Sequence, residues 1–499
     1  MKTPVCPLAV LFCSFVIACT AGEKSAFTDI TRECGVEEAI EAHYKAVPKW
    51  WLSGIDLVDF DGDGHLDLFI GAHGQQGAIA LNDGKGHFTY YADSPALKLT
   101  EIHLAHDLNE DGKLDLQITY QDGGGMWHLN TSPANDRSKL SFKSTGITAS
   151  GGQARENALI DINRDGKIDW LHENPGVVFA LNDGSGGFKS NNAFTAYKET
   201  SMLPVDLNGD GHIDFVLKCC GYKNEKEGQS RIMLNDGKNN FHDATQECGL
   251  TEDGLTIQGV GDFNQDGAPD LICLTGGKKV DVYLNDGKGK FTLLPDAVSG
   301  MAGASKPIYA NWGLAVMTDF DNDGIPDVLM NGRCFLYVLR GTGGGHFTYM
   351  NKAWNIRDLS YAAVDEGICF GDIDGDGALE IIGNSGSDKH KAIAVYHNDL
   401  PKQHWLNIRP IGAPGNRAAA GAKIRLYEPG TKKLLAYEQV VIAGRQSAHT
   451  YYAYAVTERH FGLGKLETVD ASVEFYPSGK LIEKKNIKAD AALEISEAQ

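Results

Sequence analysis

The chain has 499 residues, 42% of them hydrophobic, and a formal net charge of −20 at pH 7. This length and apolar content leave room for one large and one small folded domain, each with a buried core. The acidic balance, with no basic patch to offset it, argues against a nucleic-acid-binding protein.

Residues 1–21 have the features of an export signal. Lys2 is followed by the apolar stretch PVCPLAVLFCSFVIAC, which is too short to span a bilayer as a mature helix. The last four letters resemble a bacterial lipoprotein box, so we expect Cys19 to carry a lipid anchor, with ordinary secretion as the alternative. Both alternatives predict export, either as an outer-membrane or cell-surface lipoprotein or as a periplasmic or secreted protein. Membrane contact is then expected only through the anchor.

Residues 59–67, DFDGDGHLD, form a compact acidic motif. Acids at its positions 1, 3, 5 and 9 can converge on one point, and Gly64 at position 6 permits the sharp turn that this requires. Hard oxygen ligands at this spacing suit Ca²⁺, with a backbone carbonyl at position 7. The spacing resembles the first half of an EF-hand loop, but Ile70 replaces its final glutamate, and strands flank the motif.

The motif recurs six more times, at intervals of 45 to 57 residues, and position 6 is always glycine. Turns rich in Asp and Gly that hold no ion are the alternative, but seven copies with fixed spacing favour calcium. We call these segments ion loops 1 to 7: residues 59–67, 107–115, 161–169, 206–214, 262–270, 319–327 and 372–380. The predicted ligands at positions 1, 3, 5, 7 and 9 are Asp59, Asp61, Asp63, His65 and Asp67; Asp107, Asn109, Asp111, Lys113 and Asp115; Asp161, Asn163, Asp165, Lys167 and Asp169; Asp206, Asn208, Asp210, His212 and Asp214; Asp262, Asn264, Asp266, Ala268 and Asp270; Asp319, Asp321, Asp323, Ile325 and Asp327; and Asp372, Asp374, Asp376, Ala378 and Glu380.

The ion loops account for most of the acidity. Their ligand positions hold 24 carboxylates, and seven bound divalent cations would bring the net charge from −20 to about −6. We therefore expect up to seven calcium ions with a structural role.

Each ion loop belongs to a longer unit of four strands. One strand leads into the loop, a second leaves it, a third ends in a sequence such as LND, and a fourth begins with Phe. Four strands per ~50 residues is typical of a propeller blade, so residues 26–400 predict an all-β, seven-bladed β-propeller. Residues 27–36, FTDITRECGV, closely match the fourth strand and exit at 241–250, and we expect them to complete the last blade.

Residues 403–496 predict a separate small β-sandwich. Short stretches such as WLNIRPIG, AKIRLYE and ASVEFY are separated by turns rich in Gly and Pro. Of the cysteines outside the signal, the adjacent pair Cys219 and Cys220 could form a vicinal disulfide or remain two thiols. Most of the others lie in predicted strands and are expected to be buried thiols.

These features resemble a known family. The DxDGDGxxD loops with LND strands are similar to the FG-GAP/VCBS repeats of integrin α-chain heads, and GAKIRLY, RHFGLG and YPSGK in the tail resemble an ASPIC/UnbV domain. Together they are similar to bacterial relatives of cartilage acidic protein over roughly residues 26–496. The resemblance implies a secreted, calcium-binding protein and specifies no reaction.

We expect the ligand to bind at the rim opposite the ion loops, because loops on a rigid scaffold usually carry function. Trp50, Trp51 and Trp312 could stack on sugar rings there. The favoured interpretation is a non-catalytic protein that binds a glycan or another protein. The alternative is an enzyme similar to polysaccharide lyases that uses the central funnel. Its candidate catalytic residues are His103, Arg155, Tyr309 and Tyr361. The sequence does not decide the oligomeric state.

Overall fold

The computed structural model describes residues 25–48, 52–72, 76–92, 101–119, 125–133, 139–148, 156–173, 177–184, 187–194, 200–219, 230–252, 254–276, 279–301, 314–332, 335–356, 368–386, 391–445 and 458–498. Strands dominate this part of the chain, and its α-helix is α1 (Val36–Ala46). None of its helices has the length and apolar character of a membrane span. The all-β class predicted from the repeats is therefore confirmed.

The strands of the N-terminal part follow the repeats closely. In chain order they are β1 (Phe27–Asp29), β2 (Leu52–Val58), β3 (Asp67–Ala72), β4 (Ala78–Asn82), β5 (Phe88–Tyr90), β6 (Glu101–His106), β7 (Asp115–Thr119), β8 (Gly125–Asn130), β9 (Phe142–Thr148), β10 (Glu156–Ile160), β11 (Asp169–Glu173), β12 (Val177–Asn182), β13 (Phe188–Phe194), β14 (Thr200–Val205), β15 (Asp214–Cys219), β16 (Arg231–Asn235), β17 (Phe241–Asp243), β18 (Thr256–Gly261), β19 (Asp270–Thr275), β20 (Lys279–Asn285), β21 (Phe291–Leu294), β22 (Val298–Ser299), β23 (Leu314–Thr318), β24 (Asp327–Gly332), β25 (Phe335–Gly343), β26 (His346–Tyr349), β27 (Ile368–Gly371), β28 (Glu380–Gly386) and β29 (Lys391–Asn398).

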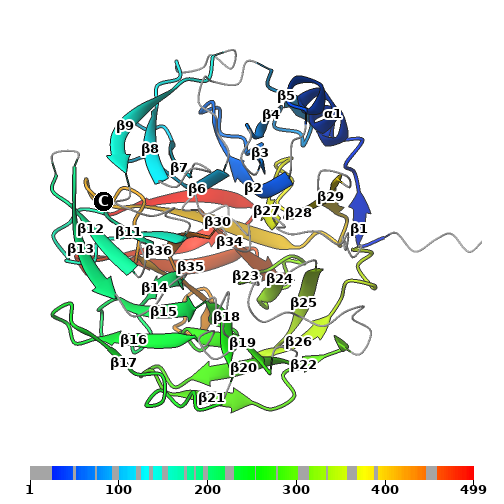
Figure 1. Ribbon diagram of the computed structural model, residues 1–499. Helices are drawn as coiled ribbons and strands as arrows, with labels where there is room; N and C mark the ends of the chain where they lie inside the picture. The colour runs from blue at the N-terminus through cyan, green and yellow to red at the C-terminus, as the bar shows by residue number, and fades with distance from the viewer. Residues whose placement is uncertain are drawn as a thin grey trace, which may run out of the picture.

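These strands form seven consecutive sheets within the described residues, and each sheet contains a run of three or four sequential antiparallel strands. Each ion loop joins the first and second strands of its sheet, which pair at the loop: in the fifth sheet, for example, Gly261 lies opposite Asp270. The sheets are arranged around a common centre (Figure 1), as in a β-propeller. We call them blades 1 to 7 in chain order, and a closed seven-bladed ring remains a prediction.

The two ends of this region meet in the last sheet. Strand β1 pairs antiparallel with β29, with Phe27 opposite Asn398. A second contact joins blade 1 to the last ion loop, because the Asn82 Nδ2 donates a hydrogen bond of 2.8 Å to the Ile373 carbonyl. The N-terminal strand is thereby paired instead of leaving an open sheet edge.

Helix α1 follows β1 and was not predicted from the sequence. It begins after Gly35, whose positive φ of 81° suits glycine. Two glutamates lie in its first turn, and His43 and Lys45 lie in its last turn, which complements the helix dipole. Its buried face, Val36, Ala39 and Ile40, packs into the core between blades 1 and 7.

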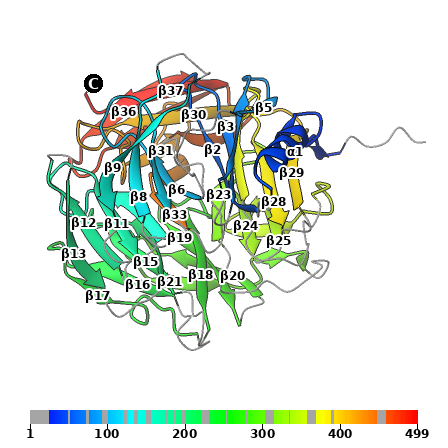
Figure 2. The same cartoon turned by 45° about the horizontal axis from the view of Figure 1, so that its top comes forward.

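The C-terminal part forms two further sheets. Strands β30 (His404–Ile411), β34 (Arg459–Gly464) and β37 (Ala491–Ser496) form one, and β31 (Lys423–Tyr427), β32 (Leu434–Gln439), β35 (Thr468–Glu474) and β36 (Leu481–Lys488) form the other. Leu406 and Phe461 from the first sheet and Ile424 and Val473 from the second share one hydrophobic core. We call residues 403–498 the C-terminal domain, and its strands lie together along one side of the ring (Figure 2).

This domain is less separate from the propeller than the sequence suggests. Strand β33 (Ile442–Arg445) leaves it and pairs antiparallel with β10, the first strand of blade 3, with Ile442 opposite Leu159. There β33 also contacts β6 and β14, the first strands of the neighbouring blades. The shared core continues from the C-terminal domain into blades 2 to 4, where it includes Trp127 and Phe215. The two parts are therefore held by a continuous sheet and a continuous core.

Candidate metal centres

All seven ion loops lie within the described residues and share one hydrogen-bond pattern. The carboxylate at position 1 accepts the N–H of the glycine at position 6, at distances from 2.7 to 3.0 Å. This glycine has a φ between 83° and 90° in every loop, a left-handed conformation that side chains other than glycine rarely adopt. The glycine therefore lets the backbone wrap around the position 1 carboxylate.

The carboxylate at position 9 anchors each loop to its blade. It accepts the N–H of position 2, at 2.9 to 3.1 Å, and a second N–H from the end of the third strand. All seven position 9 side chains belong to residues that are 0% exposed. Burial raises the pKa of this carboxyl to about 6 in Asp115, about 7 in Asp169 and Asp214, and about 8 in Asp67 and Asp270, and well above its usual range in Asp327 and Glu380.

Positions 3 and 5 complete the loop. The side-chain oxygen of position 3 accepts the N–H of position 5, and the carboxylate of position 5 accepts the N–H of position 7. In ion loops 1, 6 and 7, where position 3 is Asp, acidic oxygens from positions 1, 3 and 9 lie within 4.8 Å of one another. Ion loops 2 to 5 have an Asn oxygen at position 3 instead.

The loops fit a hard cation. Their converging side-chain donors are oxygens, and their buried carboxylates have raised pKa values because burial disfavours the charged form. A calcium ion would compensate this cost and bind the set of oxygens that it prefers. The predicted ligands at positions 1, 3 and 9 are thus brought together in ion loops 1, 6 and 7. In ion loops 2 to 5 the same residues share the hydrogen-bond pattern of the loop, and the carbonyl at position 7 is a ligand only by analogy with EF-hand loops.

The asparagine of the LND sequences has a role that we did not predict, since we read these sequences only as hairpin signals. In four blades the asparagine at this strand end reaches the preceding ion loop around the ring. It does so in two LND sequences, where Asn82 Nδ2 donates to Ile373 O and Asn285 to Leu207 O, and in the related LNT and HND sequences, where Asn130 donates to Phe60 O and Asn398 to Phe320 O. These bonds are 2.8 to 3.2 Å long and each joins two neighbouring blades. The repeated asparagine, which a hairpin does not require at that strand end, was the signal in the sequence.

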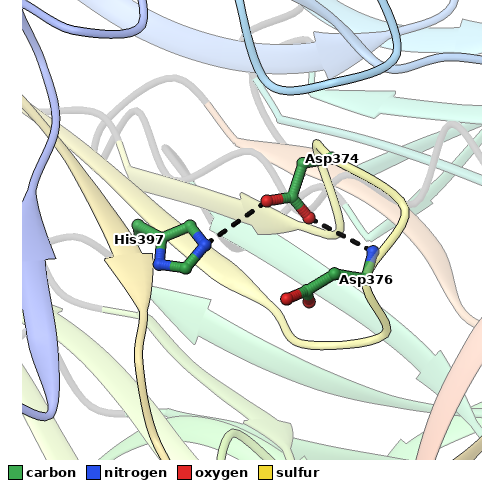
Figure 3. Close-up of side chains that lie close together, drawn as sticks. All are labelled: Asp374, Asp376 and His397. Atoms are coloured by element: carbon green, nitrogen blue, oxygen red, sulfur yellow. Dashed lines mark hydrogen bonds and ion pairs between the residues drawn. The ribbon is translucent and has the colours of Figure 1, made fainter.

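Basic side chains from outside the loops approach ion loops 4, 6 and 7. Arg340 pairs with Asp321 and Asp323 of ion loop 6. Lys423 of the C-terminal domain lies 2.6 Å from Asp206 of ion loop 4. In ion loop 7, His397 Nε2 lies 3.3 Å from Asp374 Oδ2, and Figure 3 shows the imidazole pointing from β29 toward that carboxylate, with Asp376 alongside.

The ion-loop rim is also where the C-terminal domain docks, and position 4 makes many of the contacts. Glu110 accepts the N–H of Gly415, and Arg164 donates to the carbonyl of Pro477 and lies over the Tyr476 ring. The Gln265 side chain donates to the Leu435 carbonyl, and Asn322 bonds to His460 and to the N–H of Gly464. Position 4 is glycine in ion loops 1, 4 and 7.

A cavity of about 540 Å³ lies at this junction, between ion loops 6 and 7 and the C-terminal domain. Its lining includes Asp376, Lys402, His404, Trp405 and Asp490. Lys402 forms an ion pair with Asp376 at 3.0 Å, and His404 bonds to Asp490 at 2.8 Å. The charges in this cavity are therefore at least partly paired within the chain.

The predicted ligand-binding and catalytic residues are not brought together by any described contact. Cys19, Trp50, Trp51, Arg155, Tyr309, Trp312 and Tyr361 lie outside the described residues, as does Cys220. His103 belongs to β6, but its side chain lies outside the described part, as does that of Cys219. Cys34, Cys248, Cys273 and Cys369 are buried free thiols.

Comparison with known families finds repeats and a terminal domain. The FG-GAP-like repeat family matches residues 206–273, 262–330 and 319–383, and the FG-GAP repeat family matches residues 52–81. The family described as ASPIC and UnbV matches residues 412–499.

Among curated relatives, cartilage acidic protein 1 of Xenopus tropicalis is 22% identical over 519 aligned positions, which cover 91% of this chain and 74% of that protein. The human protein is 27% identical over 52% of this chain and 39% of its own length. The chain therefore spans less than half of the human and mouse relatives. Among solved structures, an Agrocybe aegerita lectin that recognises non-reducing terminal N-acetylglucosamine covers 84% of this chain and 96% of its own, at 17% identity and a TM-score of 0.41.

Proposed function

Because the chain is a β-propeller of FG-GAP repeats with an ASPIC/UnbV domain and is homologous to cartilage acidic protein 1, we propose that it is an exported, calcium-stabilised binding protein. Calcium has a structural role in this proposal, and the ligand is a glycan or another protein. Export would place the loops where calcium is abundant, so that sites of modest affinity stay filled. Cys19 is the proposed site of a lipid anchor.

One observation carries the calcium proposal: each of the seven ion loops buries a carboxylate at position 9, and in ion loops 1, 6 and 7 the carboxylates of positions 1 and 3 lie within 4.8 Å of it. Burying acidic groups without a compensating cation is costly. Each calcium ion would tie the first and second strands of its blade, since position 1 follows the first strand and position 9 begins the second. Removal of calcium should therefore loosen each blade that holds an ion.

The binding proposal follows from what the C-terminal domain covers. This domain contacts ion loops 2 to 7, so much of that rim is occupied within the chain. We therefore propose that the opposite rim, with Trp50, Trp51 and Trp312 nearby, receives the ligand. Aromatic rings suit the apolar faces of sugars.

Calcium per chain and its effect on melting test the first part. We would equilibrate the Cys19→Ala chain with calcium, measure bound metal by mass spectrometry, and compare melting with and without EGTA. We expect several calcium ions per chain and a lower melting temperature in EGTA. Asp270→Asn should lose one ion, whereas Asp286→Asn, at an exposed hairpin acid of the same blade, should lose none. A chain without bound calcium would refute the metal proposal.

Glycan arrays and pull-down from the extracellular fraction test the second part. We expect binding that is weakened by Trp51→Ala and Trp312→Ala and that leaves the glycan intact. New unsaturated sugar ends after incubation would instead show lyase activity and overturn the non-catalytic assignment.

A further inference from the structure

Blade 6 differs from the other blades at the end of its third strand. In blades 1 to 5 and 7, the asparagine N–H donates to the position 9 carboxylate, and in blade 6 the N–H of Gly341 makes this bond to Asp327 at 2.7 Å. Arg340 therefore corresponds to the residue that directly precedes the asparagine in the other blades. Five other blades have leucine at this place: Leu81, Leu129, Leu181, Leu234 and Leu284.

The arginine side chain reaches into ion loop 6. Its Nε lies 2.5 Å from Asp321 Oδ2 and its Nη2 lies 2.5 Å from Asp323 Oδ2. These acids hold positions 3 and 5, two of the places that would face a metal ion. A guanidinium is a flat, permanently charged fork, which suits two carboxylates at once.

Ion loop 6 has a strong need for a cation. Its four acids include Asp319, Asp321 and Asp327, which are 6%, 9% and 0% exposed, and burying acidic groups without a compensating cation is costly. Ion loop 1 has the same four acids in the same positions, but Leu81 stands where blade 6 has Arg340. The two loops thus share their four acids and differ in the residue at this place, which is arginine in blade 6 and leucine in blade 1.

The C-terminal domain also covers ion loop 6. Gly462 packs against Asp319 so closely that an added Cβ would lie 2.0 Å from its Oδ2. Gln403 donates to the Asp321 carbonyl at 2.9 Å, and His460 contacts Asn322. By contrast, Gly62 and Asp63 in ion loop 1 are exposed. Calcium often completes its coordination with water molecules, which can reach the exposed ion loop 1 more easily than the covered ion loop 6.

We propose that the guanidinium of Arg340 is the resident cation of ion loop 6, so that this loop holds the C-terminal domain without calcium. The inference rests on the proposed function, in that other loops are taken to bind the metal. It assigns to blade 6 a metal-independent anchor, which would keep the C-terminal domain attached when calcium is scarce.

Two reciprocal variants test this proposal. Arg340→Leu restores the residue found in five other blades, and Leu81→Arg brings the arginine to the matching acids of ion loop 1. Calcium per chain is measured by mass spectrometry after equilibration with excess calcium. We expect Arg340→Leu to bind one more ion than the unmodified chain and Leu81→Arg to bind one fewer. An unchanged count in both variants would overturn the proposal.

Hydrogen–deuterium exchange in EGTA gives a second readout, on the peptide that spans β34. In Arg340→Leu this peptide should exchange at least tenfold faster than in the unmodified chain, and calcium should reverse the increase. In Leu81→Arg it should be unaffected. If Arg340→Leu fails to fold, the calcium count of Leu81→Arg decides. If that variant binds as many ions as the unmodified chain, the proposal is refuted. A chain that binds no calcium at all would instead refute the proposed function.

Discussion

Asn285 offers a strong test of how one buried side chain stabilises its own blade and the contact with the preceding blade. Its Nδ2 donates to the Leu207 carbonyl of the preceding ion loop at 2.8 Å and to the Pro269 carbonyl at 2.9 Å. Its Oδ1 accepts the N–H groups of Gly287 and Gly289 at 3.0 and 3.1 Å. Asn285→Ala removes all four bonds from a residue that is 3% exposed. At about 1 kcal/mol for each bond, we expect a loss of about 4 kcal/mol in the free energy of unfolding.

The assay is urea denaturation at fixed calcium, followed by circular dichroism, with stability taken from the midpoint at constant slope. Asn240→Ala is the matched control, because its Nδ2 bonds to Asp236 in an exposed hairpin of blade 4. We expect that control to change stability by less than about 0.5 kcal/mol. If the two variants differed by less than about 1 kcal/mol, the four hydrogen bonds of Asn285 would not contribute the stability that we expect.

Three further outcomes follow from the loops. In EGTA, the melting temperature should be higher near pH 5.5 than near pH 8. Burial raises the pKa of Asp67 and Asp270 to about 8, so near pH 5.5 the folded chain keeps protons that the unfolded chain has released, and this stabilises the folded state. With calcium the difference should shrink or reverse, since protons compete with the ion, and an unchanged pH dependence would contradict the metal role. Gln265→Gly should speed hydrogen exchange in β32 by removing the bond to Leu435, with no effect expected from the control Gln403→Glu on that strand. Gly62→Gln, in a loop with open space at that glycine, should cost about 1 kcal/mol in thermal stability, and no measurable loss would argue against left-handed strain there.

The propeller could be predicted because its information is local and repeated. Ion-loop spacing fixes where each first strand ends and each second strand begins, and the match between residues 27–36 and 241–250 indicated an additional fourth strand near the N-terminus. Strand β33 could not be predicted in this way. Its pairing with β10 joins segments far apart in the chain, and neither segment has a local sequence pattern that indicates its partner.

The roles of individual side chains were harder to predict from the sequence than the positions of the strands. The asparagine of LND was correctly placed at a strand end, but its bond to the neighbouring blade depends on how two blades pack. Arg340 could be recognised only after Gly341 was found to take the asparagine's bond to Asp327, because that register is set by the strand pairing. Sequence spacing defines the ion loops, whereas the contacts between blades define what surrounds them.

Position 4 of the ion loops is the place in the repeats where the residue type reflects contact with the C-terminal domain. Its residue has a positive φ in every loop, and a residue other than glycine in that conformation costs roughly 1–2 kcal/mol. Strain of this kind persists where the surroundings compensate for it. Glu110, Arg164, Gln265 and Asn322 are the four that are not glycine, and each of them contacts the C-terminal domain.

The same short loop therefore serves two purposes where position 4 is not glycine: its carboxylates face the proposed metal position, and its position 4 side chain contacts the C-terminal domain. Because one backbone turn positions both, loosening of the loop by loss of calcium should also weaken the contact with that domain. Ion loop 6 should not weaken in this way when calcium is removed, because Arg340 already pairs with its acids. Its position 4 residue, Asn322, binds His460 of the C-terminal domain. Calcium should then regulate the other position 4 contacts one by one, while the contact at blade 6 persists.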